Sequence, residues 1–383
     1  MRIALLAYEH PPHYFGGVGV FSQLLASELQ TRGHQVLVLA HTPKQSPYIS
    51  HVGSKTLAFF PSGSRVPRHF WWQIYNRSTL LRVLRRYDPD IIHCNSTVSS
   101  LLLGQLRSTR KPIVVTVHGD YAEIARIIVS KGVSAILQGW VKPYELSHYL
   151  AAAPLYEMFL RSEMRDADCI VTVSKHVEAT IRKRTHYEGR ITTIYNGIAS
   201  NSEGSCRFEA RSDAAKVLFV GRLVWLKGVT LLLKALRSLR LTHLKINLEI
   251  IGDGPLRNRL KREAERYRTD SLNISFMGFM SRDRVLDKIK ESVAVLIPSY
   301  YESHSIVLSE SLALGTPILV SNFEWSREFR LKSPNVIGTD YCGDMLYANL
   351  EELAEHNKHC ADSNVFTAQK MVNRYLSLYE SLI

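Results

Sequence analysis

The sequence predicts an α/β protein with two parallel-sheet domains, and three observations support this fold class. Continuous Val/Ile/Leu-rich runs recur along the whole chain with helical patterns between them, as in parallel sheets covered on both faces. A length of 383 residues exceeds what one hydrophobic core usually holds. The polar segment Asn201–Ser205, which follows Asn196-Gly197, supplies a linker. We therefore expect one domain at residues 1–198 and a second at 199–365.

The runs expected to form strands are spread over both halves. In order they are residues 3–7, 36–40, 91–94, 113–117, 170–173, 191–194, 217–220, 246–251, 274–277, 293–297 and 317–320. Residues 366–383 have apolar side chains at helical spacing, at Met371, Tyr375, Leu378, Tyr379 and Leu382. This spacing predicts a packed C-terminal helix.

The composition, 45% hydrophobic and 22% charged, is that of an ordinary soluble globular protein. Five cysteines without CxxC spacing favour a reducing compartment and argue against a disulfide framework or a zinc site. The apolar start Met1–Ala7 stops at Glu9, so we expect a first strand and not a signal peptide. No apolar run approaches the roughly 18 residues of a spanning helix. We expect a cytoplasmic protein.

The formal net charge of +13 is concentrated in residues 1–198, which carry 23 Lys+Arg against 13 Asp+Glu. Between residues 65 and 86, basic and aromatic side chains are interleaved: Arg65, Arg68, Phe70, Trp71, Trp72, Tyr75, Arg77, Arg82, Arg85 and Arg86. Such a stretch suits the anionic inner face of a plasma membrane, and it equally suits a solvated helix whose aromatic side chains lie in the core. We find no nucleic-acid-binding motif to accompany it.

The segment Tyr301–Val320, YESHSIVLSESLALGTPILV, is the most informative part of the chain. Two carboxylates, Glu302 and Glu310, are separated by seven residues, just after the apolar run at 293–297. The order is strand, polar loop and helix, and in a parallel sheet ligands bind at the carboxyl ends of strands. The helix N-terminus favours an anion such as a diphosphate, and ionised carboxylates accept hydrogen bonds from sugar hydroxyls. A helix with one capping glutamate is the structural alternative.

Two further loops have features of ligand-binding segments. Gly16, Gly17 and Gly19 precede a helix and permit close backbone approach, although the pattern is not the GxGxxG of dinucleotide-binding domains. His118 closes the strand 113–117, where a histidine is either a site residue or, more commonly, structural.

A third loop carries two cations beside glycines. Gly221-Arg222 and Lys227-Gly228 follow the run at 217–220. Arginine forks onto phosphate oxygens and lysine acts as a point charge, so this loop can neutralise a diphosphate. An ordinary surface loop is the alternative.

Together these motifs resemble the retaining glycosyltransferases of family 4 (glycosyl transferases group 1), over nearly the whole chain. The resemblance rests on the order and spacing of GGVG with LASELQTRGHQVLVL, TVHG, YNG at Tyr195–Gly197, GRLVWLKG, IIGDGPLR and the paired glutamates. It implies two Rossmann-like parallel-sheet domains facing a cleft, the GT-B architecture. The acceptor would bind the N-terminal domain and a nucleotide-sugar donor the C-terminal one, with the helix of residues 366–383 returning to the N-terminal domain.

The resemblance also implies site residues. Arg222 and Lys227, beside Gly221, would hold the diphosphate, and Glu310 the ribose hydroxyls. Glu302 and the backbone of Ser303, His304 and Ser305 would address the donor sugar and its phosphates, and Met280 would lie near the nucleobase. Gly16 and Gly17 would face the phosphates or the acceptor, and His118 the transferred sugar. The family needs no metal or other cofactor for this step, and retention is usually explained by same-face attack, with the departing phosphate taking the acceptor's proton.

The sequence departs from the family pattern at three places. Ser305 stands where glycine is usual, next to His304 where an aromatic residue is frequent, and Ala199 stands where an aspartate often follows the NG turn. After Val320 the common Gly-Gly-Pro-Glu is absent, so Glu328 is only an approximate match. These departures leave the donor open.

We expect a hexosyltransferase that uses a nucleoside-diphosphate sugar and a glycan or lipid-linked acceptor in cell-surface polysaccharide synthesis. The alternatives are a non-catalytic or degenerate GT-B nucleotide-sugar-binding protein, an epimerase or hydrolase on the same architecture, and a nucleic-acid binder supported by net charge alone.

Overall fold

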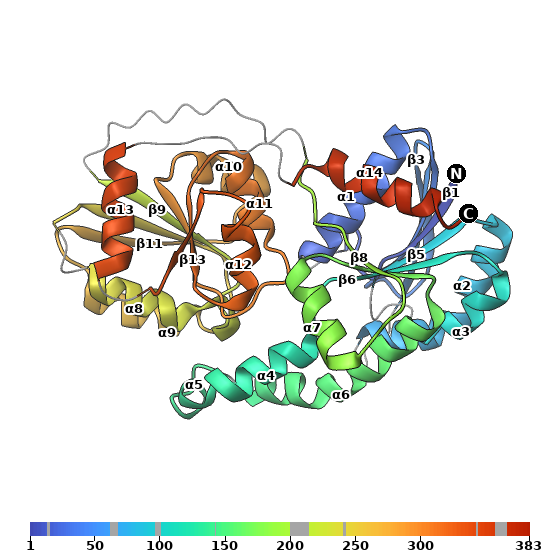
Figure 1. Ribbon diagram of the computed structural model, residues 1–383, viewed down its shortest axis with the longest axis horizontal. Coiled ribbons are helices and arrows are strands. Elements are labelled where there is room, and N and C mark those ends of the chain that lie inside the picture. Colours follow the sequence, from blue (N-terminus) through green and yellow to red (C-terminus); the bar gives the residue numbers. More distant parts are fainter. Residues whose placement is uncertain are drawn as a thin grey trace. The chain divides into compact units, whose positions relative to one another are not determined.

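The computed structural model describes most of the chain in two compact units (Figure 1). The described residues are 1–13, 16–61, 68–95, 101–141, 143–199, 214–239, 243–341, 344–356 and 366–383. Unit 1 comprises Met1–Glu123, Leu150–Ala199 and Phe366–Ile383, and unit 2 comprises Ile124–Tyr149 and Ser200–Val365.

Unit 1 is built on an eight-stranded sheet with the order β3-β4-β2-β1-β5-β6-β7-β8. Its pairs of neighbouring strands are parallel, apart from β3, which is antiparallel to β4. The strands are β1 (Arg2–Leu6), β2 (Gln35–Thr42), β3 (Tyr48–Val52), β4 (Lys55–Pro61), β5 (Ile91–Asn95), β6 (Ile113–Val117), β7 (Cys169–Thr172) and β8 (Ile191–Thr193).

Helices cover both faces of this sheet, which explains why its central strands carry apolar side chains on both faces. On one face, α1 (Gly17–Thr31) and α14 (Ala368–Glu380) pack on the strands. The other face is covered by helices from four segments: α2 (Arg68–Tyr87), α3 (Leu103–Leu106), α6 (Pro143–Asp166) and α7 (Lys175–Thr185). A short helix, η1 (Arg107–Thr109), follows α3.

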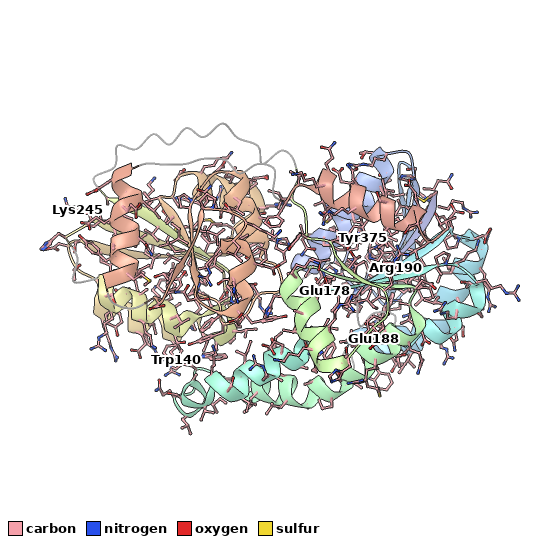
Figure 2. All side chains as sticks on the ribbon, in the orientation of Figure 1. Trp140, Glu178, Glu188, Arg190, Lys245 and Tyr375 are labelled. Atoms are coloured by element: carbon pink, nitrogen blue, oxygen red, sulfur yellow. The ribbon has the colours of Figure 1, made fainter. Side chains whose placement is uncertain are left out.

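The C-terminal helix α14 is an integral part of unit 1. Tyr375, labelled in Figure 2, and Tyr379 are both fully buried. The Tyr379 hydroxyl lies 2.6 Å from Nδ1 of His93, and the Tyr375 hydroxyl lies 2.9 Å from Oγ1 of Thr116. Because His93 Nε2 also lies 2.7 Å from Thr116 Oγ1, one buried hydrogen-bond network joins β5, β6 and α14.

Unit 2 is built on a six-stranded parallel sheet with the order β11-β10-β9-β12-β13-β14. The strands are β9 (Ala215–Val220), β10 (Ile246–Ile251), β11 (Leu272–Gly278), β12 (Ala294–Ile297), β13 (Ile318–Ser321) and β14 (Val336–Thr339). This is the open α/β arrangement in which loops at the carboxyl ends of the strands bind ligands.

Between residues 214 and 356, the described helices of unit 2 follow its strands in turn. They are η3 (Trp225–Lys227), α8 (Val229–Leu239), α9 (Arg257–Ala264), η4 (Glu265–Tyr267), α10 (Arg282–Lys290), α11 (Ile306–Ala313), α12 (Glu324–Arg330) and α13 (Asp344–His356). Buried side chains of α8, α9 and α13 share one core with the sheet residues Val217, Phe219 and Leu296. Figure 1 shows α8 and α9 along one side of the strands and α10 and α11 along the other.

The segment Ile124–Tyr149 was expected in the N-terminal domain, but it groups with unit 2. It contains most of α4 (Tyr121–Lys131) and all of α5 (Val133–Leu137). Ile124, Ile127 and Ile128 form an apolar stripe on α4 that joins the unit 2 core. Trp140, labelled in Figure 2, is also buried there, with the Arg259 guanidinium 3.7 Å from its ring centroid. This burial is the physical reason for the difference.

Every strand expected from an apolar run is present, within two residues at each end. Three further strands, β3, β4 and β14, were not predicted. Within the described part of the chain, no helix combines the length and apolarity that crossing a bilayer requires.

Candidate functional site

In unit 2, the expected binding loop after β9 is held by backbone hydrogen bonds to the loop after β10. Leu223 N donates to Asp253 O at 2.9 Å, and Leu256 N donates to Leu223 O at 3.1 Å. The loop carries Gly221 and the exposed side chain of Arg222. The two glycine-containing segments noted in the sequence therefore form one structure at the carboxyl edge of the sheet.

The loop ends at Gly228, which has a left-handed backbone with φ +76°. A Cβ at this position would clash with the carbonyl oxygen and Cβ of Pro298 at the end of β12. Only glycine meets both demands, so the Lys-Gly pair is explained by the turn. The close approach brings Lys227, the residue before it, next to the loop after β12.

Lys227 and Glu302 form an ion pair in this position. Lys227 Nζ lies 2.6 Å and 2.8 Å from the two carboxylate oxygens of Glu302. The Glu302 side chain is 9% exposed and that of Lys227 is 31% exposed. Ser299 Oγ donates a further hydrogen bond of 2.7 Å to Glu302 Oε1, so the carboxylate is oriented from two sides.

Two further hydrogen bonds fix the backbone at Ser299, just after the end of β12. The Ser299 carbonyl oxygen accepts from Ser321 Oγ at 2.6 Å and from the Trp325 indole nitrogen at 3.0 Å. Trp325 is on α12 and is fully buried. It lies in the segment that lacks the family's usual Gly-Gly-Pro-Glu, and the half-buried Glu328 is on the same helix.

The loop of Ser303, His304 and Ser305 leads into α11. Ser305 is the N-cap of this helix, and its hydroxyl accepts from Leu308 N at 3.4 Å. Serine is among the favoured N-cap residues, which explains how the loop accommodates it where the family usually has glycine. His304 is buried, stacks on Phe329 with a ring separation of 5.4 Å, and lies 3.0 Å from Ser309 Oγ. Burial lowers the pKa of His304 to about 3, so its ring is neutral at physiological pH.

Glu310 is on α11, and its partner comes from α10. Arg282 Nε lies 2.9 Å from Glu310 Oε1, and the Glu310 side chain is 5% exposed. Burial raises the pKa of Glu310 above its ordinary value, and Arg282 opposes that rise. Met280, two residues before Arg282, is partly exposed, next to the almost fully exposed Phe279.

In unit 1, the glycine loop begins α1. Gly16 is the N-cap residue with an extended backbone, φ −169°, and both Gly16 and Gly17 are exposed. A Cβ at Gly16 would have none of the described residues within 4 Å. The described part of the protein therefore leaves space for a side chain at position 16. If glycine is required there, the reason would be a ligand that approaches the backbone closely.

His118 lies directly after β6. Its Nε2 is 3.2 Å from Asn95 Oδ1, at the end of β5, and the ring of Phe21 on α1 packs at 4.5 Å. Burial lowers the pKa of His118 to about 3, so its imidazole is neutral.

The sequence-predicted residues thus form two sets at the carboxyl edges of the sheets. Gly221, Arg222, Lys227, Met280, Glu302, Ser303, His304, Ser305 and Glu310 are in unit 2, and Gly16, Gly17 and His118 are in unit 1. The polar residues that contact them and were missed include Ser299, Arg282 and Asn95. Among the described residues, no group of three or more His, Cys, Asp or Glu side chains could hold a metal ion.

Comparison with known proteins gives consistent matches along the chain. The family model of Glycosyltransferase Family 4 matches residues 15–201, and that of Glycosyl transferases group 1 matches residues 206–332. Glycogen synthase of Mycobacterium tuberculosis (strain CDC 1551 / Oshkosh) is 28% identical over 351 residues, covering 84% of this chain and 78% of its own. Alpha-monoglucosyldiacylglycerol synthase of Streptococcus pneumoniae (strain R6) is 23% identical over 384 residues, covering 96% and 82%.

A solved structure supports the fold. Sucrose-phosphate synthase from Thermosynechococcus elongatus superposes with a TM-score of 0.79 at 18% identity, covering all of this chain and 98% of its own. The two parallel-sheet α/β units are therefore those of the GT-B architecture. Because the two family models match successive parts of the chain, which together make up most of it, the chain belongs to the family 4 glycosyltransferases of the group 1 type.

Proposed function

We propose that this glycosyltransferase moves a hexose-type sugar from a nucleoside-diphosphate sugar to a glycan or glycolipid acceptor, with retention at the anomeric carbon, in cell-surface polysaccharide synthesis. The observation that carries the proposal is the Lys227–Glu302 ion pair at the carboxyl edge of a parallel sheet, in which Lys227 belongs to the same loop as the exposed Arg222. It combines cations for a diphosphate with a carboxylate for sugar hydroxyls.

Each part of the donor would have its own residues. Arg222 and Lys227, with the close backbone approach at Gly221, would neutralise the diphosphate. The N-terminus of α11, with the backbone of Ser303, His304 and Ser305, would add N–H dipoles. Glu310 would accept hydrogen bonds from the ribose hydroxyls, and Met280 would contact the nucleobase.

The remaining residues would address the sugar and the acceptor. Glu302 would bind hydroxyls of the transferred sugar, and His118 would contact that sugar as a neutral imidazole. Gly16 and Gly17 would allow the backbone to approach the phosphates or the acceptor.

The chemistry follows from the charges that develop. Cleavage of the anomeric bond builds positive charge on the sugar and negative charge on the departing nucleoside diphosphate. Preorganised cations and N–H dipoles at the diphosphate stabilise this transition state. The acceptor hydroxyl would attack from the face that the diphosphate leaves, and the departing phosphate would take its proton. We assign no protein nucleophile, metal or other cofactor to this step.

The test is thermal stabilisation by UDP, GDP, ADP, CMP and their sugars, followed by transfer assays with the nucleotide that binds. Ligand at 100 times its Kd stabilises the native state by about 2.7 kcal/mol. We expect a shift with one nucleoside diphosphate and turnover of its sugar. Binding without turnover on any glycan or lipid acceptor would favour a non-catalytic nucleotide-sugar-binding protein, and no binding at all would contradict both.

We also propose that the protein works at the cytoplasmic face of a membrane, docking through α2. Arg77, Arg82, Arg85 and Arg86 are exposed on this helix, together with Ile74 and Tyr75, which are 42% and 52% exposed. Trp72, by contrast, is in the core and donates to Phe60 O at 3.1 Å. A basic face with exposed apolar side chains suits anionic lipid. Cys94 and Cys169 are buried and form no disulfide, which fits a reducing compartment.

Sedimentation with phosphatidylserine-containing vesicles tests this docking. Changing Arg82, Arg85 and Arg86 to Ser should release the protein, whereas the same change at Lys261, Arg262 and Arg266 on and after α9 should not. Equal binding by both variants, or no binding of the wild type at low salt, would contradict the proposal.

A further inference from the structure

Asn95 is the last residue of β5, next to the strand that ends before His118. The parallel register pairs Asn95 with Thr116, two residues before His118, so both side chains are on the same face at the same edge of the sheet. Asn95 is 1% exposed, and its Oδ1 lies 3.2 Å from His118 Nε2.

The Asn95 amide is only half satisfied. Its Nδ2 is buried and has no hydrogen-bond partner among the residues that the structure describes. A buried donor without a partner is costly in free energy, so each such group in a native structure calls for an explanation. A hydrogen bond to a bound ligand is one.

The amide oxygen of Asn95 bears on which ring nitrogen of His118 carries the proton. The imidazole is neutral and carries one N–H. Since Asn95 Oδ1 can only accept, a hydrogen bond between the two side chains requires the proton on Nε2 and leaves Nδ1 with its lone pair. Phe21 packs edge-on against the same ring at 4.5 Å and 68°, and it is itself 3% exposed. The ring is therefore held from two elements, β5 and α1.

We propose that Asn95 is a positioning residue for His118 that fixes the Nε2–H tautomer, and that its free Nδ2 donates to a hydroxyl of the sugar that His118 contacts. This inference rests on the proposed function and deepens it. Because Asn95 occupies the Nε2 side of the ring, Nδ1 of His118 faces the opposite side. Asn95 Nδ2 and His118 Nδ1 would therefore bind different hydroxyls of the sugar, the first as a donor and the second as an acceptor.

Two variants separate the two roles of the amide. Asn95→Ala removes both, whereas Asn95→Asp keeps an oxygen for Nε2–H and removes the donor. For Asn95→Ala we expect kcat to fall by at least about 10-fold, because a small misplacement of a reacting group is costly. Thermal stabilisation of this variant by nucleoside diphosphate should equal that of the wild type, since the side chains expected to bind the nucleotide are in unit 2. For Asn95→Asp we expect kcat to fall while the tautomer stays Nε2–H.

The tautomer is read by 15N NMR of histidine-labelled protein, with the His118 signals assigned from a His118→Gln variant. Wild type should show protonated Nε2, and Asn95→Ala should show a mixture or protonated Nδ1. The matched control is Asn76→Ala, since Asn76 is a buried asparagine of unit 1 whose Nδ2 is satisfied by Pro61 O and Trp72 O. It should lower Tm and leave both kcat and the His118 signals unchanged.

The outcomes distinguish this inference from the proposed function. Wild-type kcat in Asn95→Ala, or protonated Nδ1 in the wild type, would overturn the positioning role while sugar transfer stands. A wild type that transfers no sugar, with the tautomer still changed by Asn95→Ala, would overturn the transferase proposal and leave the positioning of His118 intact.

Discussion

Both carboxylate oxygens of Glu302 accept hydrogen bonds from Lys227 Nζ, at 2.6 Å and 2.8 Å, although the two residues are 75 positions apart. Because Ser299 also donates to this carboxylate, Glu302 stays oriented before any ligand is bound. A diphosphate that enters beside Lys227 would share the ammonium group with Glu302, so the two residues should be coupled energetically.

We predict that Lys227→Ala lowers kcat/KM by about 10³-fold, since removing one preorganised charge contact has an effect of this size. The Glu302 carboxylate would be left buried with only Ser299, so Tm should also fall. Steady-state kinetics and thermal unfolding measure both effects. If the losses of Lys227→Ala and Glu302→Gln simply added in the double variant, the coupling would be refuted.

Gly228 provides a test of the turn that places Lys227. With φ +76° and a clash with Pro298, we expect Gly228→Ala to destabilise the protein by more than about 2 kcal/mol. Gly221→Ala is the matched control, because its Cβ would lie 3.6 Å from Phe219, an ordinary contact. Urea unfolding compares them, and equal stability of the two variants would show that the turn tolerates a side chain.

A substitution at Gly16 tests whether a ligand approaches this loop, without the effect of backbone strain. Since its φ of −169° suits any residue and its surroundings are open, Gly16→Ala should fold with wild-type Tm. If a ligand approaches this loop, turnover should nevertheless fall by about 10-fold or more. Unchanged kinetics would remove Gly16 from the ligand site.

The raised pKa of Glu310 makes the stability of the protein depend on pH. Burial raises its pKa in the folded protein, so the protonated form is favoured on folding. Its contribution to stability is therefore present below the unfolded value near 4.5 and is lost as pH rises through the folded pKa. Glu310→Gln, which stays neutral, should gain stability relative to wild type as pH rises above about 4.5.

The same variant should bind nucleoside diphosphate less tightly, because a neutral amide is a weaker acceptor for ribose hydroxyls than a carboxylate. Thermal unfolding from pH 4 to 8, with and without nucleotide, measures both effects. A Tm difference between Glu310→Gln and wild type that falls with rising pH would contradict the assignment of burial as the main influence.

The fold could be predicted from sequence because the apolar runs are long and buried on both faces. All expected strands formed, and β3, β4 and β14 were missed for identifiable reasons. Tyr48–Val52 is mostly exposed, Lys55–Pro61 is only half buried, and Val336–Thr339 is fully buried only at its two ends. The packing of Ile124–Tyr149 in unit 2 was also missed, since no change in composition marks this segment.

The candidate site shows the same limit. Glycines, cations and paired glutamates are visible in sequence because they occur in motifs. Ser299, Arg282 and Asn95 are single polar residues at the ends of ordinary segments. Asn95 and Arg282 contact His118 and Glu310, which are 23 and 28 residues away along the chain, whereas Ser299 contacts Glu302, 3 residues away. Pairing of this kind is decided by strand order and register, which local patterns do not encode.

The burial of α14 in unit 1 has a consequence for protein synthesis. The ribosome makes residues 1–199 well before Tyr375 and Tyr379. Until those two residues are made, His93 and Thr116 of the nascent sheet lack the tyrosine hydroxyls that they contact in the complete protein. All of unit 2 is synthesised before α14, and it can therefore mature before the unit that precedes it in the chain. Translation that stalled between residues 199 and 366 would present an apolar sheet face to chaperones and proteases, and synthesis of the last helix would remove it.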